Sequence, residues 1–132
     1  MRVIDASSLA KFVNREPNWK KVEEYLLEGC ISVDLCIKEV LNTVWKRIYR
    51  GLIDKEDGFR IANEFLKNIM IRLIDQEPFL ESALKLSVKY GITVYDALYI
   101  ALAKKLELQL ITSDEKQFKV SVAEGIDTIY IE

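Results

Sequence analysis

The stretch TVYDALYIALAKK, residues 93–105, places a carboxylate beside a continuous apolar run. Asp96 directly precedes seven apolar residues, Ala97 to Ala103, which predict a helix buried on nearly every side. Thr93 and Asp96 also have the spacing of a helix-capping pair. The first question is therefore whether Asp96 only caps this helix or also takes part in chemistry.

Working outward from this helix, short apolar segments alternate with helical patterns along the whole chain. This alternation predicts one α/β domain over residues 1–132, with a parallel sheet of about five strands and helices on both faces. At two of the crossovers we expect a pair of helices. The expected strands are 2–5, 30–33, 70–74, 108–112 and 128–131, and the expected helices are 6–13, 18–28, 35–50, 54–69, 77–90 and 93–105, with a helical turn from 114.

The composition excludes several kinds of site. The chain has no histidine, which excludes a histidine general base, a histidine-containing nucleophile triad and histidine-ligated zinc. Cys30 and Cys36 have neither zinc-site nor redox-pair spacing and are expected to be buried free thiols. A net charge of −2 argues against a broad surface that coats nucleic acid, although a local basic strip remains possible.

The amino terminus and the hydropathy pattern indicate where in the cell the protein is expected. The first apolar segment begins at residue 1 and contains Asp5, which leaves no room for a signal peptide. No run approaches the roughly 18 apolar residues of a membrane span. We therefore expect a cytoplasmic protein with no membrane association.

Four acidic residues fall where such a sheet binds ligands. In right-handed crossovers each helix starts at the carboxyl edge of the sheet. Asp5 ends the first strand, Asp114 follows the fourth, Asp96 lies in the first turn of its helix, and Glu39 lies early in the helix after the second strand. If the first and fourth strands are neighbours, Asp5 and Asp114 flank the crevice of the sheet.

Each of these acids also has a purely structural interpretation. Aspartates favour helix starts through capping and the helix dipole, and Glu39 lies opposite the apolar stripe of its helix, where water could solvate it. Taken together, three aspartates converge on one edge where Ser, Thr or Asn would cap equally well. Clustered carboxylates of this kind are usually held by a hard divalent cation such as Mg²⁺ or Mn²⁺.

Four motifs carry a family resemblance, in order and over nearly the whole chain: DASSLA (5–10), EVLN (39–42), YDALYIALA (95–103) and LITSDEKQF (110–118). Together they resemble the PIN domain, specifically the VapC toxins of VapBC toxin–antitoxin pairs. The resemblance implies a metal-dependent ribonuclease in which one or two Mg²⁺ or Mn²⁺ ions activate water for attack on RNA. It assigns catalysis and metal binding to Asp5, Glu39, Asp96 and Asp114, with Ser7, Asn42 and Thr112 in support.

The resemblance also implies partners. RNA must approach an acidic pocket, and Lys11, Lys46 and Arg47 are candidate contacts by their proximity in sequence. A VapB-like antitoxin would hold the protein inactive, and a homodimer is expected. Aromatic residues could anchor the antitoxin or a dimer contact, although each also fits the apolar stripe of its helix: Phe12, Trp19, Tyr25, Trp45 and Tyr49.

Three other functions stay open at this point. A phosphotransfer or phosphatase domain would have a second acid beside Asp5, whereas Ala6 and Ser7 stand there. A PIN-like module could bind RNA or a protein without cutting. An RNA-processing nuclease could share the site without acting as a toxin.

Overall fold

The computed structural model describes all residues from 1 to 132 and contains one parallel five-stranded sheet. The strand order is β3-β2-β1-β4-β5. Val3 of the central strand pairs with Ile31 on one side and Leu110 on the other, so the first and fourth strands are neighbours. The strands are β1 (Arg2–Ile4), β2 (Cys30–Val33), β3 (Arg72–Ile74), β4 (Leu110–Thr112) and β5 (Thr128–Tyr130).

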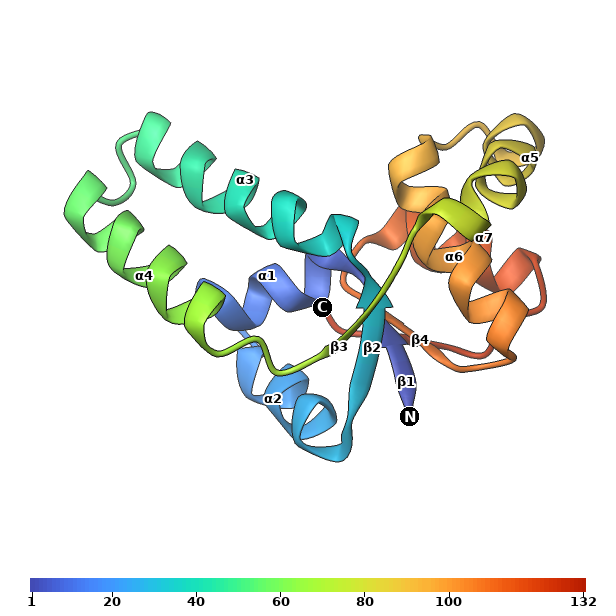
Figure 1. Ribbon diagram of the computed structural model, residues 1–132, viewed down its shortest axis with the longest axis horizontal. Coiled ribbons are helices and arrows are strands. Elements are labelled where there is room, and N and C mark those ends of the chain that lie inside the picture. Colours follow the sequence, from blue (N-terminus) through green and yellow to red (C-terminus); the bar gives the residue numbers. More distant parts are fainter.

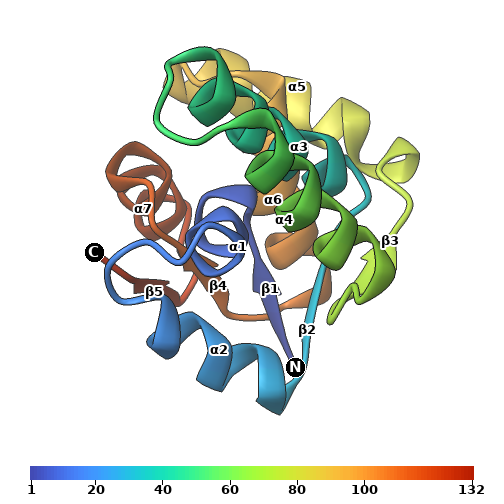
Figure 2. The ribbon, with the colours of Figure 1, turned by 90° about the vertical axis from the view of Figure 1, so that its left-hand side faces the viewer.

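Helices cover both faces of the sheet, as predicted. Helices α1, α3 and α4 lie on one side of the strands and α5, α6 and α7 on the other, while α2 lies below α1 (Figures 1 and 2). The helices are α1 (Ala6–Val13), α2 (Trp19–Glu28), α3 (Leu35–Tyr49), α4 (Lys55–Lys67), α5 (Leu80–Tyr90), α6 (Val94–Leu106) and α7 (Glu115–Ala123), and a 3₁₀ turn, η1 (Glu77–Phe79), precedes α5.

Three crossovers hold a helix pair, and the expectation of two was wrong. The pairs are α1–α2, α3–α4 and α5–α6. The third pair arises because the helical patterns at 77–90 and 93–105 both fall between β3 and β4. Gly91 separates α5 from α6 in the left-handed conformation, at φ 68°.

The predicted buried helix forms the centre of the molecule. Every residue from Ala97 to Ala103 in α6 is at most 3% exposed. Burial of each large apolar side chain contributes about 1.5–3 kcal/mol, which makes α6 a major source of stability. The Thr93 side chain accepts a hydrogen bond from the Asp96 N–H, so the predicted cap is present.

Helices α3 and α4 form an arm that packs on α1. Asn14, a buried residue at the end of α1, donates to Thr43 Oγ1 at 3.0 Å and accepts from Arg47 at 2.9 Å. A Cβ at Gly58 of α4 would overlap the end of the Ile48 side chain, so glycine at this position leaves room for Ile48 between the two helices. These contacts fix the position of α3 beside the sheet.

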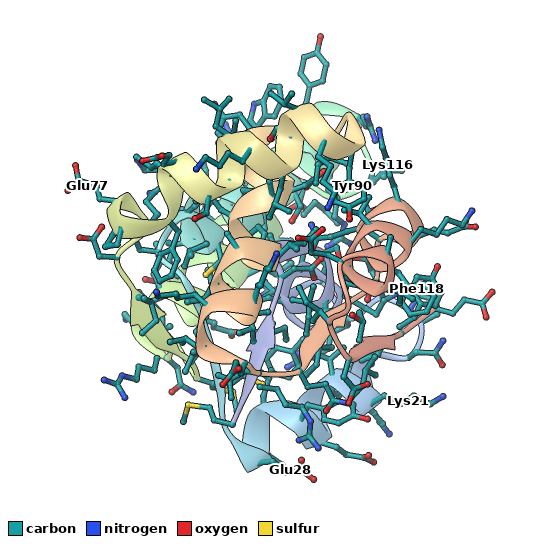
Figure 3. All side chains as sticks on the ribbon, turned by 90° about the vertical axis from the view of Figure 1, so that its right-hand side faces the viewer. Lys21, Glu28, Glu77, Tyr90, Lys116 and Phe118 are labelled. Carbon is teal, nitrogen blue, oxygen red and sulfur yellow. The ribbon has the colours of Figure 1, made fainter.

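On the opposite side of the sheet, helices α5, α6 and α7 pack against one another (Figure 3). The Glu124 carboxylate, 6% exposed, pairs with Lys104 and Lys89 and accepts a hydrogen bond from the Tyr90 hydroxyl.

Cys30 and Cys36 are buried free thiols, as expected. None of the helices has the length and apolar character needed to cross a membrane.

Candidate active site

The carboxyl edge of the sheet opens into a pocket of about 570 Å³ that all four predicted acids line. Because β1 and β4 pair in parallel, Asp5 after β1 and Asp114 after β4 reach the same edge. Helix α3 supplies Glu39 and α6 supplies Asp96 from the two sides of the sheet (Figure 1). The predicted supporting residues Ser7 and Asn42 line the same pocket.

Asp5 is the deepest of these acids, at 1% exposed. It is the N-cap of α1: Oδ1 accepts from the Ser8 N–H at 2.9 Å, as the capping interpretation predicts. Ser7 and Thr112 also donate to it, at 2.8 and 2.5 Å. Burial, with a smaller contribution from the charge of Asp114, nevertheless raises the pKa of the Asp5 carboxyl to about 7.

Hydroxyl groups join the two central strand ends. Thr112, fully buried at the end of β4, accepts from the Asp114 N–H at 3.0 Å while donating to Asp5. Ser7 Oγ accepts from the Ser113 N–H at 2.9 Å. The Ser7 and Thr112 hydroxyls therefore link Asp5 to the backbone of Ser113 and Asp114.

Asp114 is the N-cap of α7, where Oδ1 accepts from the Gln117 N–H at 2.9 Å. Its other carboxylate oxygen accepts no hydrogen bond from the protein. Asp96 is half-buried, and both burial and the nearby charge of Asp114 raise its pKa. Capping and participation in the acidic pocket are therefore compatible in this fold.

Glu39 is held by a tyrosine that the sequence did not single out. The Tyr99 hydroxyl donates to Glu39 Oε1 at 2.5 Å, from a ring that is 1% exposed. Burial and then the charge of Asp96 raise the pKa of Glu39, while the tyrosine hydrogen bond opposes that rise. Tyr99 lies inside the apolar run of α6, where its hydroxyl had no visible partner in the sequence.

Gln117 is a second pocket residue that the sequence did not reveal. Its Nε2 donates to the Asp96 carbonyl at 3.3 Å, which orients the carboxamide. Its Oε1 is buried and has no hydrogen-bond partner, the one such side-chain atom in the structure. A buried acceptor without a donor is costly, so this oxygen indicates a position where a ligand or a hydrated ion can bind.

Two lysines line the pocket, Lys38 and Lys46, and only Lys46 was predicted. Lys11 and Arg47 do not line the pocket: the Lys11 ammonium donates to the Pro17 carbonyl, and the Arg47 guanidinium donates to Asn14. The five aromatic residues considered as anchors for an antitoxin or a dimer contact differ in burial. Phe12, Trp19 and Tyr25 are half-buried, whereas Trp45 and Tyr49 are exposed.

The acids share one pocket, but no three of them lie close enough together to hold a metal ion as they stand. Asp5 is held by hydrogen bonds from Ser7, Ser8 and Thr112, and Glu39 is held by one from Tyr99. Uncompensated carboxylates also repel one another. The donor set is entirely oxygen, which matches the ligand preference of Mg²⁺ and Mn²⁺.

A parallel α/β domain with a cluster of carboxylates at the carboxyl edge of its sheet is the architecture expected from the sequence motifs. The PIN domain family model matches residues 2–123, and the chain belongs to this family. A ribonuclease of Pyrobaculum aerophilum, VapC3, is 32% identical over an alignment of 119 positions that covers 86% of this chain and 89% of VapC3. Exonuclease VapC9 of the same organism is 28% identical over 98% of this chain and 92% of its own.

A solved structure shares the fold. The crystal structure of VapBC2 from Rickettsia felis, bound to a DNA fragment from its promoter, contains a chain that matches 99% of this one with a TM-score of 0.69. The match covers 98% of that chain at 16% identity. At this identity the likeness supports the fold alone.

Proposed function

We propose that the protein is a divalent-metal-dependent ribonuclease that acts as the toxin of a toxin–antitoxin pair. The observation that carries the proposal is the single pocket lined by Asp5, Glu39, Asp96 and Asp114, which four separate parts of the chain contribute. Membership of the PIN family and similarity to proteins named ribonuclease and exonuclease support nuclease chemistry.

The residues of the pocket suit Mg²⁺ or Mn²⁺. Burial and mutual repulsion raise the pKa values of Asp5, Glu39 and Asp96, which a bound cation would counteract. Asp5, Asp96 and Asp114 are the proposed ligands, with Glu39 as a further ligand or as the group that positions water. When bound, the ion would lower the pKa of water and neutralise charge that develops on the phosphate.

The other pocket residues position the reacting groups. Ser7 and Thr112 hold Asp5, and Tyr99 holds Glu39, so that neither carboxylate can turn away from the pocket. Lys38 and Lys46 lie on the α3 wall, where their ammonium groups can pair with RNA phosphates against the acidic centre. Asn42 lies between them as a hydrogen-bonding group.

The proposed partners are a VapB-like antitoxin, which would cover the pocket, and a second copy of the chain. For the second copy, α5 exposes an apolar stripe of Leu80, Leu84 and Val88. The acid Glu81 lies in the first turn of this helix and Lys89 in the last. Antiparallel pairing of two α5 helices would therefore bring opposite charges together.

A cleavage assay with matched helix caps tests the nuclease. Asp114 and Asp54 are both N-caps whose Oδ1 accepts from the backbone three residues on, but only Asp114 lines the pocket. We expect the parent to cut single-stranded RNA with Mn²⁺ or Mg²⁺ and not with EDTA. Asp114→Asn should lower the rate by orders of magnitude, while Asp54→Asn keeps it. Equal rates for the two variants would refute the assignment of Asp114.

A growth assay tests the toxin role separately. Expression of the parent in a bacterial host should slow growth, and Asp114→Asn should remove the effect. Normal growth with abundant RNA-cleaving protein would indicate an RNA-processing nuclease, and RNA binding without cleavage would indicate a non-catalytic module.

A further inference from the structure

Helix α3 continues outward from the acidic pocket as a stripe of cationic and aromatic side chains. Lys38, Asn42 and Lys46 line the pocket, and Trp45 and Tyr49 follow on the same side of the helix, three or four positions apart. Tyr49 is ten positions beyond Glu39, which is about 15 Å along the helix axis. We call Trp45, Tyr49 and the flanking Lys46 and Arg50 the α3 stripe.

The two rings of the α3 stripe face solvent. Trp45 is 55% exposed and Tyr49 77% exposed, and their rings stack with centroids 5.3 Å apart and an interplanar angle of 22°. Neither ring lines the acidic pocket or the cavities beside Leu86, Phe65 and Lys116. The pair is therefore a preformed, solvent-exposed aromatic stack that lies outside the core and outside the acidic pocket.

The charge of α3 differs from that of the chain as a whole. From Leu35 to its C-cap the helix carries four basic residues and a single acid, Glu39, whereas the chain has a net charge of −2. Arg47 is engaged by Asn14, but Lys46 and Arg50 make no ion pair within the protein. The free cations thus flank the two exposed rings.

We propose that the α3 stripe binds single-stranded RNA on its way into the acidic pocket, with bases stacked on Trp45 and Tyr49 and phosphates paired with Lys46 and Arg50. This proposal rests on the proposed function, because it extends the substrate path of the same site. Exposed aromatic faces between cations are the means by which proteins hold single strands. A peptide anchor would instead need a concave pocket, which these rings lack.

The experiment measures RNA affinity in a background that does not cut. In the Asp114→Asn protein with EDTA, fluorescence anisotropy follows a labelled single-stranded RNA and an abasic strand of the same length. Stacking is worth about 1–3 kcal/mol per base, so Trp45→Ala should weaken RNA binding at least about fivefold. It should leave the affinity for the abasic strand unchanged. Tyr49→Phe keeps a ring and should bind like the parent.

Phe59→Ala is the matched control, because Phe59 is 65% exposed on α4 and outside the α3 stripe. A direct signal is available as well: the chain has two tryptophans, so Trp45 is the only one in a Trp19→Phe background. Its fluorescence should be quenched by RNA and not by the abasic strand. Circular dichroism confirms that each variant is folded.

Two outcomes would overturn this proposal without affecting the nuclease assignment. The first is an active parent whose Trp45→Ala variant binds RNA as tightly as Phe59→Ala does. The second is an unchanged RNA affinity with a parent dimer that becomes a monomer in Trp45→Ala by sedimentation, which would make the α3 stripe a contact between copies. Failure of the nuclease assignment would appear differently, as no metal-dependent cleavage by the parent.

Discussion

In the metal-free protein, Asp5→Asn should gain stability relative to the parent as pH rises from 5 to 8, because Asp5 is a buried carboxylate that must ionise over this range. Asp5 is 1% exposed, and its pKa is raised from 3.8 to about 7, chiefly by burial. Between these two pH values the folded protein retains a proton that the unfolded chain has lost. The unfolding free energy of the parent therefore falls as pH rises from about 4 to about 7 and then levels off.

The size of the effect follows from the shift. Each unit of pKa corresponds to 1.36 kcal/mol, so the full loss in the parent is on the order of 4 kcal/mol. Of this loss in unfolding free energy, about 2–3 kcal/mol falls between pH 5 and pH 8. Asparagine does not titrate and keeps an acceptor for the Ser8 N–H and the Ser7 hydroxyl. The unfolding free energy of Asp5→Asn, relative to that of the parent, should therefore rise by about 2–3 kcal/mol between pH 5 and pH 8.

Urea unfolding of both proteins with EDTA at pH 5, 6, 7 and 8 measures this difference directly. Asp54→Asn, at the N-cap of α4 and outside the pocket, is the control for replacing a capping carboxylate by its amide. Saturating Mn²⁺ at pH 8 should stabilise the parent and close the gap. A difference between Asp5→Asn and the parent that stays constant from pH 5 to pH 8 would refute the reasoning.

Three further predictions use other parts of the structure. Mn²⁺ at a hundred times its dissociation constant should stabilise the parent by about 2.7 kcal/mol and Asp96→Asn by much less, in thermal melts with and without EDTA; equal shifts would leave Asp96 as a helix residue only. Overpacking against Ile48 costs about 1–3 kcal/mol and alanine gains about 1 kcal/mol over glycine inside a helix, so Gly58→Ala should lower the unfolding free energy by no more than about 2 kcal/mol, which urea unfolding checks. Lys104 and Tyr90 hold the pKa of Glu124 at about 2, so this pairing stabilises the fold above about pH 4.5 and is lost as pH falls toward 2. Glu124→Gln should therefore cost about 1–2 kcal/mol at pH 7, after allowance for the exposed lysines, and nothing near pH 2.

The local elements could be predicted because each has a strong periodic signal and a recognisable boundary. Helix α6 follows Thr93 and its apolar run, and Asp54 caps α4 as expected. The four acids could be placed at one edge because parallel topology alone fixes that edge. The number of helix pairs was underestimated although both helices between β3 and β4 had been recognised.

Side-chain partners were harder to predict because they depend on contacts between distant parts of the chain. Tyr99 fits the apolar pattern of its helix, and its hydroxyl donates to Glu39, which lies 60 positions away in the sequence. The pattern around Tyr99 therefore gave no sign of this contact. Lys11 was chosen for its proximity in sequence to Asp5, but α1 directs its ammonium to Pro17 instead. Gln117 had no signal in the sequence, because an unpaired acceptor is visible only when all surrounding atoms are placed.

The hydrogen bond from Thr112 to Asp5 joins residues 107 positions apart, which ties the pocket to the order in which the chain is made. Synthesis proceeds from the amino terminus, so Asp5, Glu39 and Asp96 leave the ribosome before the strand that pairs with β1 beside them. A chain interrupted before β4 has three of the acids but neither Thr112 nor Asp114, and the central strand has an open edge. Such long-range pairing also forms late and cooperatively in folding. Nascent and truncated chains therefore lack the assembled pocket, and any activity of this pocket requires synthesis and folding of the chain at least as far as Asp114 and Gln117.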